Sequence, residues 1–248
     1  MAARLVKQVG NVAIYDLIGS GDVDRLERLF ALYARLFPQY EHYVPRMRRR
    51  AQFESEHRPG HVVHYWLVEV DGRPAGLRTF RYVRERRCGL AHALAVDPAF
   101  RNVLVDGRRL SVFIIYECLE QIIRDAKERG DPPVLGMVNE VEPERLMEHY
   151  IRNGLVQLPL KYVEPIFPPE VEGRSRLEEL AITRFSYMHM GFLPNPELMV
   201  KEYTHDMVVD FAKAFLVDHY CLPEEHPAVL EVIETIKVQG AEHDRAQN

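Results

Sequence analysis

The chain has 248 residues, of which 47% are hydrophobic and 28% are charged, and its formal net charge is −5. This length is enough to bury a sizeable core, as one large domain or as a domain with an extension. The negative charge argues against a general binder of nucleic acid or of membrane surfaces. Three widely spaced cysteines fit neither a disulfide framework nor a zinc-binding pattern.

The N-terminal residues 1–7 contain no apolar run like that of a signal peptide, and no stretch approaches the ~18 apolar residues of a transmembrane helix. We therefore expect a cytoplasmic protein with no metal, no nucleic-acid partner and no membrane partner.

Hydrophobic periodicity and turn residues predict the elements of the first half of the chain. The predicted strands are 12–17, 64–70, 75–83 and 88–96, and the predicted helices are 23–37, capped by Asp22, and a short one near 46–50. In the last strand, His92 shares a face with Leu90, Leu94 and Val96, while small residues occupy the other face. That small face lets another element pack closely on the sheet.

The second half alternates helices and strands before it ends in two amphipathic helices. The expected helices are 108–129, 143–152, 202–220 and 227–239, and the expected strands are 134–141, 158–166 and 177–188. Because hairpins come first and strand–helix–strand units follow, we predict a mixed α/β (α+β) fold. Its central sheet is expected to be mostly antiparallel and flanked by helices, with a C-terminal helical extension.

The segment from His92 to Leu110 combines a strand, a turn, a polar loop and the start of a long helix. Exposed amides and the dipole at a helix N-terminus attract phosphate. A histidine lies within the strand itself. The segment therefore predicts an anion cradle close to a titratable side chain.

Two motifs resemble the GNAT superfamily of acyl-CoA-dependent N-acyltransferases. Val96-Asp97-Pro98-Ala99-Phe100-Arg101 is similar to the family's Val-x-Pro-x-x-Arg, and Tyr150-Ile151-Arg152-Asn153-Gly154-Leu155 is similar to its Tyr-x-x-x-Gly-Phe. The resemblance covers residues 5–190. It implies a GNAT-like acyltransferase domain at 1–190 and a C-terminal helical extension at 191–248.

The resemblance also implies roles for individual residues. His92-Ala93-Leu94-Ala95-Val96 is similar to the arylalkylamine N-acetyltransferases, in which a strand histidine takes the proton from the amine. An imidazole, with an unperturbed pKa of ~6.5, suits that task. Tyr150 corresponds to the general acid that protonates the thiolate of CoA. A strand amide among Leu94, Ala95 and Val96 would polarise the thioester carbonyl.

The implied co-substrate is acetyl-CoA or another acyl-CoA, and the implied acceptor is a small-molecule or peptide amine that attacks directly in a ternary complex. Asn139, at the end of a strand, would contact pantetheine. The residues expected to hold the pyrophosphate run along one loop: Arg101, Asn102, Val103, Leu104, Val105, Asp106, Gly107, Arg108 and Arg109.

That loop departs from the family pattern, because it is about one residue longer and lacks the first glycine. Val103 to Val105 are bulky, and Asp106 would repel phosphate, although Arg108 and Arg109 would offset its charge. The departure leaves open a second interpretation, a non-catalytic GNAT-fold binding or regulatory protein.

Each candidate residue also has a structural interpretation. His92 is alternatively a half-buried structural histidine, and Tyr150 an aromatic packed at a helix end. Other candidates are assigned to structure by their spacing: His61 and His64 as ordinary strand or surface histidines, Arg46 to Arg50 as a solvated helix face, and Glu140 and Glu142 as surface residues rather than alternative bases. The C-terminal helices are expected to pack on the core or to form a homodimer.

Overall fold

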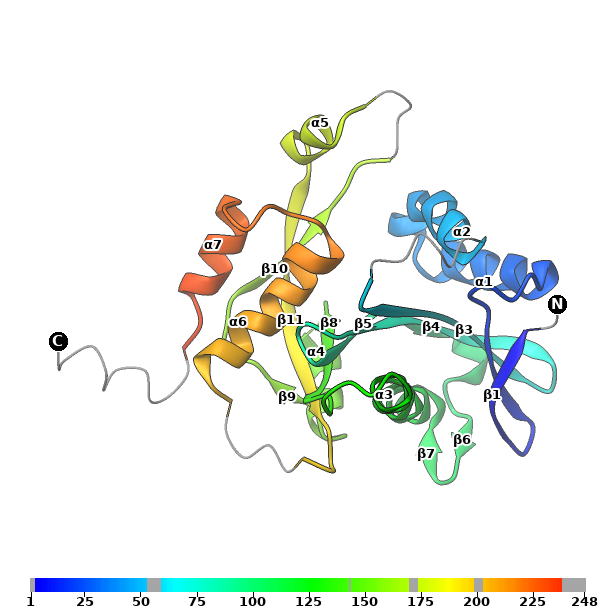
Figure 1. Ribbon diagram of the computed structural model, residues 1–248. Helices are drawn as coiled ribbons and strands as arrows, with labels where there is room; N and C mark the ends of the chain where they lie inside the picture. The colour runs from blue at the N-terminus through cyan, green and yellow to red at the C-terminus, as the bar shows by residue number, and fades with distance from the viewer. Residues whose placement is uncertain (1–2, 53–58, 143, 170–173, 199–202, 238–248) are drawn as a thin grey trace, which may run out of the picture. The chain divides into compact units, whose positions relative to one another are not determined.

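The computed structural model describes residues 3–52, 59–142, 144–169, 174–198 and 203–237 (Figure 1). The chain divides into two compact units. The first contains Met1–Arg84 and Ala91–Pro132, and the second contains Glu85–Leu90 and Pro133–Asn248.

The first unit is a sheet with helices on both faces. Its strands follow one another in space in chain order: β1 (Arg4–Val9), β2 (Val12–Asp16), β3 (His61–Val70), β4 (Arg73–Val83) and the part of β5 (Cys88–Val96) that begins at Ala91. The pairs β1–β2, β2–β3 and β3–β4 are antiparallel. The helices of the unit are α1 (Val23–Leu36), α2 (Val44–Gln52) and α3 (Leu110–Glu128), with a 3-10 turn at Pro38–Tyr43.

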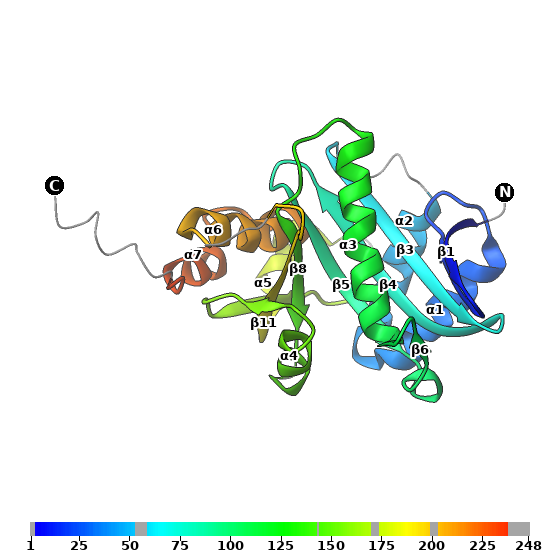
Figure 2. The ribbon, with the colours of Figure 1, turned by 90° about the horizontal axis from the view of Figure 1, so that it is seen from below.

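Alternation along the strands decides which side chains meet which helices. Tyr65 and Leu67 lie on the face covered by α1 and α2, where they join one apolar cluster with Leu29 and Phe30. On the other face, Gly76 leaves room for the side chain of Ile114, which belongs to α3. Figures 1 and 2 show α3 on one side of β3 and β4, and α1 and α2 on the other.

A buried ionic cluster connects α3 to the sheet. The His64 ring on β3 lies between two carboxylates, with Nδ1 2.6 Å from Asp16 Oδ2 on β2 and Nε2 2.9 Å from Asp125 Oδ2 on α3. Gln121 and Arg4 donate further hydrogen bonds to Asp125 and Asp16, respectively. Burial alone would lower the pKa of His64, but the two carboxylates outweigh it and raise the pKa to about 9. The ring is therefore an imidazolium at neutral pH, which corrects the expectation of an ordinary strand histidine.

The second unit is built around a long central strand. Its elements are β8 (Gly136–Val141), α4 (Glu144–Ile151), β9 (Val156–Gln157), β10 (Tyr162–Ile166), α5 (Arg176–Ala181), β11 (Arg184–Pro194), α6 (His205–Lys213), a π-helical turn (Ala214–His219) and α7 (Pro227–Glu234). β11 pairs antiparallel with β8, β9 and β10.

Each face of the second unit's sheet carries a helix. On one face, Gly191 of β11 lies close to α4. A Cβ added at Gly191 would be only 3.1 Å from the side chain of Met147. On the other face, Phe211 of α6 stacks on Phe192 of β11 with 4.8 Å between ring centroids. Helix α6, in the C-terminal segment, thus packs on the sheet of this unit.

The predicted fold class is confirmed, because the chain is mixed α/β with mostly antiparallel sheet, flanking helices and a helical C-terminal segment. The predicted strand 177–188 is wrong at its start. Ser175 and Glu178 form a capping box that begins the helix α5 instead. Strand β1 was not predicted, and Pro143, Glu202 and residues 238–239 of the expected helices lie outside the described residues. The division at residues 190/191 stays a prediction.

Among the residues that the structure describes, no helix is both long enough and apolar enough to span a lipid bilayer.

The His64 cluster predicts a stability that depends on pH. Because the folded pKa of His64 is about 9 and the unfolded pKa is ~6.5, the stabilisation is complete below pH 6.5 and is lost as pH rises through 9. This site alone should lower the free energy of unfolding by roughly 3 kcal/mol between pH 6 and pH 10. Urea denaturation across that range measures the loss.

In Asp125→Asn, the pKa of His64 falls and the loss of stability shifts to lower pH. Asp24→Asn, an exposed carboxylate on α1, is the matched control and should leave the profile unchanged. Identical pH profiles for the wild type and Asp125→Asn would contradict the assignment.

Candidate functional site

The connection from β5 to α3 lies wholly in the first unit. After Val96, the Asp97 carboxylate accepts a 2.8 Å hydrogen bond from the N–H of Ala99 and caps a 3-10 turn at Pro98–Phe100. The Asp97 carboxylate also pairs with Arg35 of α1. The backbone N–H of Asp97 donates to the carbonyl of Ala75 at 2.9 Å. These contacts fix the end of β5 against its neighbours.

The predicted pyrophosphate loop is a β-hairpin. Leu104–Val105 (β6) pair antiparallel with Arg108–Arg109 (β7), and the two-residue turn is Asp106-Gly107. Both turn residues have positive φ (50° and 77°), as a type I′ turn requires. The helix therefore begins at Leu110 and not at Arg108, and the loop expected to replace the family's glycine-rich segment is an ordered hairpin instead.

The residues of the hairpin differ in exposure. Val105 is buried and Leu104 is exposed, while Asp106, Gly107, Arg108 and Arg109 are all exposed. The three bulky residues of the loop thus differ in exposure: Val103 is half-buried, Leu104 is exposed and Val105 is buried.

The N-terminus of α3 follows directly and is cationic. The N–H of Leu110 donates to the carbonyl of Val103 at 3.0 Å, and the Arg109 side chain makes no capping hydrogen bond. The first turn of α3 carries no acidic residue. Ser111 and Val112 come next, where a helix has no carbonyl of its own to offer its N–H groups. Together with the exposed Arg108 and Arg109, this end of the helix is suited to an anion.

Arg108 and Arg109 both have partners in the structure. The Arg108 guanidinium lies 4.7 Å from the centre of the Tyr116 ring. Arg109 Nη1 lies 3.5 Å from the carbonyl of Arg101 and 3.5 Å from Asn102 Oδ1. The hydrogen bonds of Arg109 are at the long limit, so its charge remains available to a phosphate.

His92 lies on β5 within the first unit, and its ring nitrogens are shielded from solvent. Burial lowers its pKa well below 6.5, and the positive charges of Arg81, Arg78 and Arg50 lower it further. The ring is therefore neutral at pH 7. A neutral imidazole can accept a proton, although one with a depressed pKa is a weaker base than the sequence predicts.

The three residues expected to polarise a carbonyl follow His92. Leu94, Ala95 and Val96 are half-buried. The strand is held against β4 by the Ala93 N–H, which donates to Thr79 Oγ1 at 3.2 Å.

Tyr150 and Asn139 belong to the second unit. Tyr150 lies near the C-terminal end of α4, is buried, and its carbonyl accepts the N–H of Leu155 at 3.1 Å. Asn139 lies on β8, buried, and its amide donates to the carbonyl of Met137 at 3.3 Å. The structure brings the residues 94–109 together in one unit and Tyr150 with Asn139 in the other.

Glu140 is not the surface residue that the sequence predicts. Tyr162 donates a hydrogen bond to its Oε1, and Tyr220 donates to its Oε2 at 2.8 Å. The Tyr220 hydroxyl also lies 3.2 Å from Glu164 Oε1. Burial raises the pKa of Glu140 well above its usual range, and the charge of Glu164 raises it further. Glu142, by contrast, is exposed, as predicted.

Glu140 and Glu164, here called the acidic pair, share the hydroxyl of Tyr220, which can donate to only one carboxylate at a time. The geometry is satisfied when one of the two carboxyls keeps its proton. Sequence reasoning missed Tyr162, Glu164 and Tyr220, since they are distant along the chain and meet only when α6 packs on the sheet. No pattern of spacing would have indicated them.

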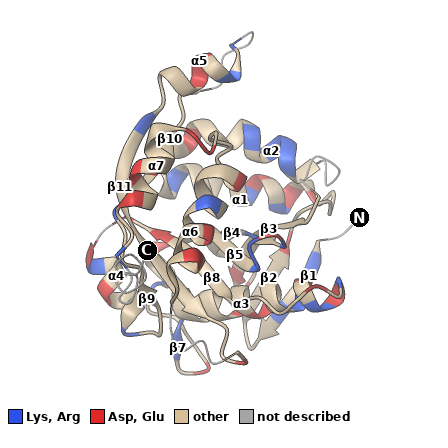
Figure 3. Ribbon diagram, turned by 60° about the vertical axis from the view of Figure 1, so that its left-hand side comes forward, with Lys and Arg blue, Asp and Glu red and all other residues tan. Residues whose placement is uncertain are grey.

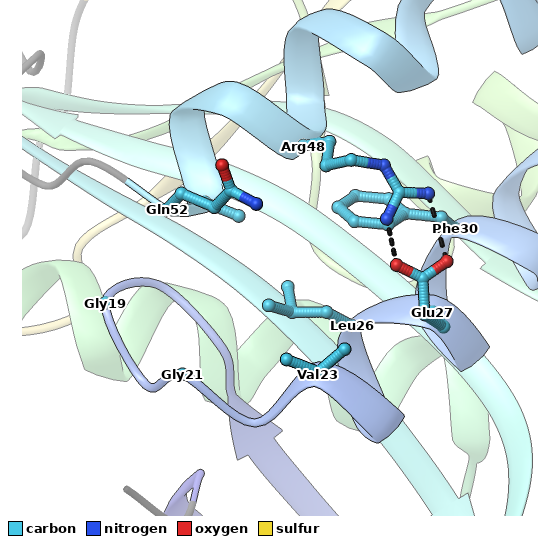
Figure 4. A pocket seen from close by; sticks show the side chains of 9 residues that line it. Gly19, Gly21, Val23, Leu26, Glu27, Phe30, Arg48 and Gln52 are labelled. Atoms are coloured by element: carbon cyan, nitrogen blue, oxygen red, sulfur yellow. Dashed lines mark hydrogen bonds and ion pairs between the residues drawn. The ribbon is translucent and has the colours of Figure 1, made fainter.

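A small cavity of about 210 Å³ lies between α1 and α2 (Figure 4). Apolar Val23, Leu26 and Phe30 line it, and Arg48 of α2 reaches across to pair with Glu27 of α1. None of the predicted site residues lines this cavity. It is smaller than typical ligand pockets of ~300–1,000 Å³.

Among the described residues, no group of histidine, cysteine, aspartate and glutamate side chains is arranged to hold a metal ion.

Residues 26–103 match the acetyltransferase (GNAT) family. The match begins within α1, includes β3, β4 and β5, and ends at Val103, before the hairpin. The resemblance predicted from the sequence is therefore confirmed for the strand that carries His92.

Solved structures of acetyltransferases are similar to the chain, whereas no curated protein matches it. RimL, a ribosomal L7/L12 alpha-N-protein acetyltransferase, is 12% identical with a TM-score of 0.45, and the match covers 78% of this chain and 94% of RimL. The PaiA N-acetyltransferase of Thermoplasma acidophilum, in complex with coenzyme A, is 13% identical with a TM-score of 0.41, over 73% of this chain and 98% of that one. Similarity at this level says nothing about the reaction or its substrate.

The acidic pair gives a prediction about stability. Because the folded pKa of Glu140 is raised, stability falls as pH rises from 4.5 through that pKa. Glu164→Gln removes the repulsion, so at pH 8 it should raise the free energy of unfolding by about 1 kcal/mol, the size of one pKa unit. Urea denaturation at pH 5 and pH 8 measures the change.

The change should be smaller at pH 5, where the pair already holds its proton. Glu142→Gln, at an exposed position directly after β8, should have no effect at either pH. A Glu164→Gln protein that is less stable than the wild type at pH 8 would show that the pair does not repel.

Proposed function

We propose that the protein is an acyl-CoA-dependent N-acyltransferase that transfers an acetyl group from acetyl-CoA to a primary amine by direct attack in a ternary complex. The observation that carries this proposal is the cationic N-terminus of α3, which has no side-chain cap and follows the GNAT-matched strand β5.

The residues of this region fit the phosphate groups of CoA. The first turn of α3 offers amides without an acidic competitor, and Arg108 and Arg109 add exposed positive charge. The hairpin replaces glycine-rich backbone, so side chains rather than loop amides would contribute more of the binding. Asn139 is proposed to contact the pantetheine arm. When bound, acetyl-CoA supplies a thioester carbonyl as the acyl donor.

His92 is the proposed proton acceptor for the amine. Its neutral ring is ready to take a proton at pH 7, and burial together with the nearby arginine charges disfavours a long-lived imidazolium. Tyr150 is the proposed donor of a proton to the leaving thiolate, because a phenol with a pKa of ~10 is protonated at neutral pH. An N–H among Leu94, Ala95 and Val96 would hold the carbonyl oxygen as negative charge develops.

A second candidate function has one observation in its favour. The segment 102–107, where the family has glycines, is folded into the β6–β7 hairpin. A GNAT-fold protein with this hairpin would serve as a non-catalytic binding or regulatory module if the hairpin excluded CoA. Binding of acetyl-CoA therefore separates the two candidates.

Isothermal titration with acetyl-CoA tests the cofactor site. We expect saturable binding, and Arg109→Gln should weaken it by about tenfold, the effect of one lost charge-assisted contact of ~1.4 kcal/mol. Arg129→Gln, at the opposite end of α3, is the matched control and should bind as the wild type does. Absence of detectable binding at millimolar acetyl-CoA would favour the non-catalytic alternative.

Substitution of the proposed acid and base tests the mechanism. His92→Ala and Tyr150→Phe should each lower kcat by roughly 100-fold while acetyl-CoA affinity is retained, because general acid–base steps contribute at least that much. His205→Ala and Tyr187→Phe, which alter exposed side chains, are the controls. Thiol release measures turnover.

The pH profile tests His92 separately. Because its pKa is lowered, the acid limb of kcat/KM should lie well below pH 6.5. A limb at 6.5 or above, or unchanged turnover in both variants, would remove these residues from the mechanism.

A further inference from the structure

Strand β11 of the second unit extends beyond one of its neighbours. β10 pairs with residues 184–188, whereas β8 pairs with residues 189–194 and ends at Val141, opposite His189. Figure 1 shows β10 and β11 continuing side by side toward α5. Among the described residues, the strands that pair with β11 are β8, β9 and β10. Residues 184–188 of β11 therefore have a paired strand on one side and an open edge on the other.

A proline decides which backbone groups face this open edge. Pro165 of β10 lies opposite Phe185 and has no N–H, so the two residues form a pair that exchanges no hydrogen bonds. The N–H and C=O of Phe185 therefore point away from β10, and those of Tyr187, two residues further on, do the same. The intervening residues point the other way, as at Met190, whose carbonyl accepts the N–H of Leu158 next to β9.

The open edge combines outward backbone groups with exposed aromatic side chains. Within the described part of the chain, the N–H and C=O of Phe185 and Tyr187 make no hydrogen bond. Their side chains share one face of the strand and are 37% and 74% exposed, respectively. Residues 184–188 include neither the Lys nor the Pro that usually protects an edge. Such an edge is suited to the addition of another strand.

The open edge is complementary to itself. When two copies of it pair antiparallel about a two-fold axis at Ser186, Phe185 of each copy lies opposite Tyr187 of the other. Because both residues direct their backbone groups outward, each of these pairs exchanges two hydrogen bonds. Each pair also brings two aromatic side chains together on one face, which stabilises antiparallel strands. A strand of unrelated sequence would satisfy the backbone groups without these aromatic pairs.

The charges around the edge are compatible with a second copy. The segment from Arg174 to Met188 contains three basic and two acidic residues. Figure 3 shows that α5 carries residues of both signs. In the antiparallel pairing, Arg184 lies opposite Met188, and the two copies of Arg184 are about 13 Å apart along the strands. This separation exceeds the ~8 Å screening length at physiological ionic strength, so the pairing sets no like charges against each other.

We propose that the protein forms a homodimer in which residues 184–188 of two copies pair antiparallel, with Ser186 on the two-fold axis. The β10–β11 pair of each copy then becomes half of a sheet that continues from one copy into the other. This interface differs from the one expected at the C-terminal helices. It is also independent of the proposed acyltransferase function, because none of its residues is assigned to acyl-CoA or to the reacting groups.

Analytical ultracentrifugation of the full-length protein over a wide range of concentrations measures the dimer. We expect a reversible dimer, and Tyr187→Pro should raise its Kd by at least tenfold. Proline at this position removes the outward N–H and the aromatic ring but no hydrogen bond to β10. Leu230→Lys, at an exposed position of α7, is the matched control and should leave Kd unchanged. A protein that stays monomeric, or a dimer weakened by Leu230→Lys and not by Tyr187→Pro, would overturn the proposal.

Disulfide crosslinking tests the register, and it does so even if Tyr187→Pro fails to fold. Ser186→Cys is made together with Cys221→Ser, which removes the exposed cysteine. Because the backbone groups of Ser186 point toward β10, the two copies of this residue form a pair without hydrogen bonds. The Cα atoms of such a pair are about 4.5 Å apart, within the range of roughly 4.4–6.8 Å that a disulfide spans. We expect mild oxidation to give a crosslinked dimer on non-reducing electrophoresis.

Arg184→Cys in the same Cys221→Ser background is the control for chance collisions. Arg184 is exposed, but its two copies are about 13 Å apart in the proposed pairing, which is too far for a disulfide. Crosslinking should therefore be at least tenfold faster for Ser186→Cys than for Arg184→Cys. Equal rates for the two variants, or no crosslinked dimer of Ser186→Cys, would contradict the pairing.

Discussion

The imidazolium of His64, held between Asp16 and Asp125, is the interaction on which the first unit depends. Two buried carboxylates in a protein interior require a positive partner, and His64 supplies it with both ring nitrogens. Because the three residues come from β2, β3 and α3, one charged group joins two strands of the sheet to the long helix. The cost of burying these charges is offset only when all three elements are in place.

This constraint has a consequence for function at the other end of α3. Asp125 lies in the last turns of the helix, whereas the N-terminus at Leu110 receives the chain from the β6–β7 hairpin. A helix fixed to the sheet near its C-terminus presents its N-terminal amides at a defined place beyond β5. The proposed phosphate site and the strand with His92 are therefore both positioned by the packing of the first unit.

The sequence predicts the elements well where periodicity is strong and side chains are apolar. Strand β5 was predicted with its observed bounds, and α1 differs by one residue at its end. The resemblance predicts a phosphate-binding loop at 102–108, whereas Asp106-Gly107, a strong type I′ turn signal, folds residues 104–109 into a hairpin. A strand is predicted from Leu177, whereas the capping box of Ser175 and Glu178 begins a helix at Arg176–Ala181.

The candidate site was less predictable, for a physical reason. The sequence identifies His92, but its pKa is lowered by burial and then by the charges of Arg81, Arg78 and Arg50, and only folding supplies both. Likewise, Glu140 was assigned to the surface, since its tyrosine partners come from β10 and the segment after α6. Patterns in one segment of sequence do not report charges that arrive from another.

We propose that an acyl-CoA binds at the junction of β5 and α3. Hydrogen exchange of backbone amides, compared with and without saturating acetyl-CoA, tests it most directly. We expect slower exchange at Leu94 to Val96 and at Ser111 to Phe113, with no change at the far end of α3. Unchanged exchange at both segments under saturating acetyl-CoA would contradict it.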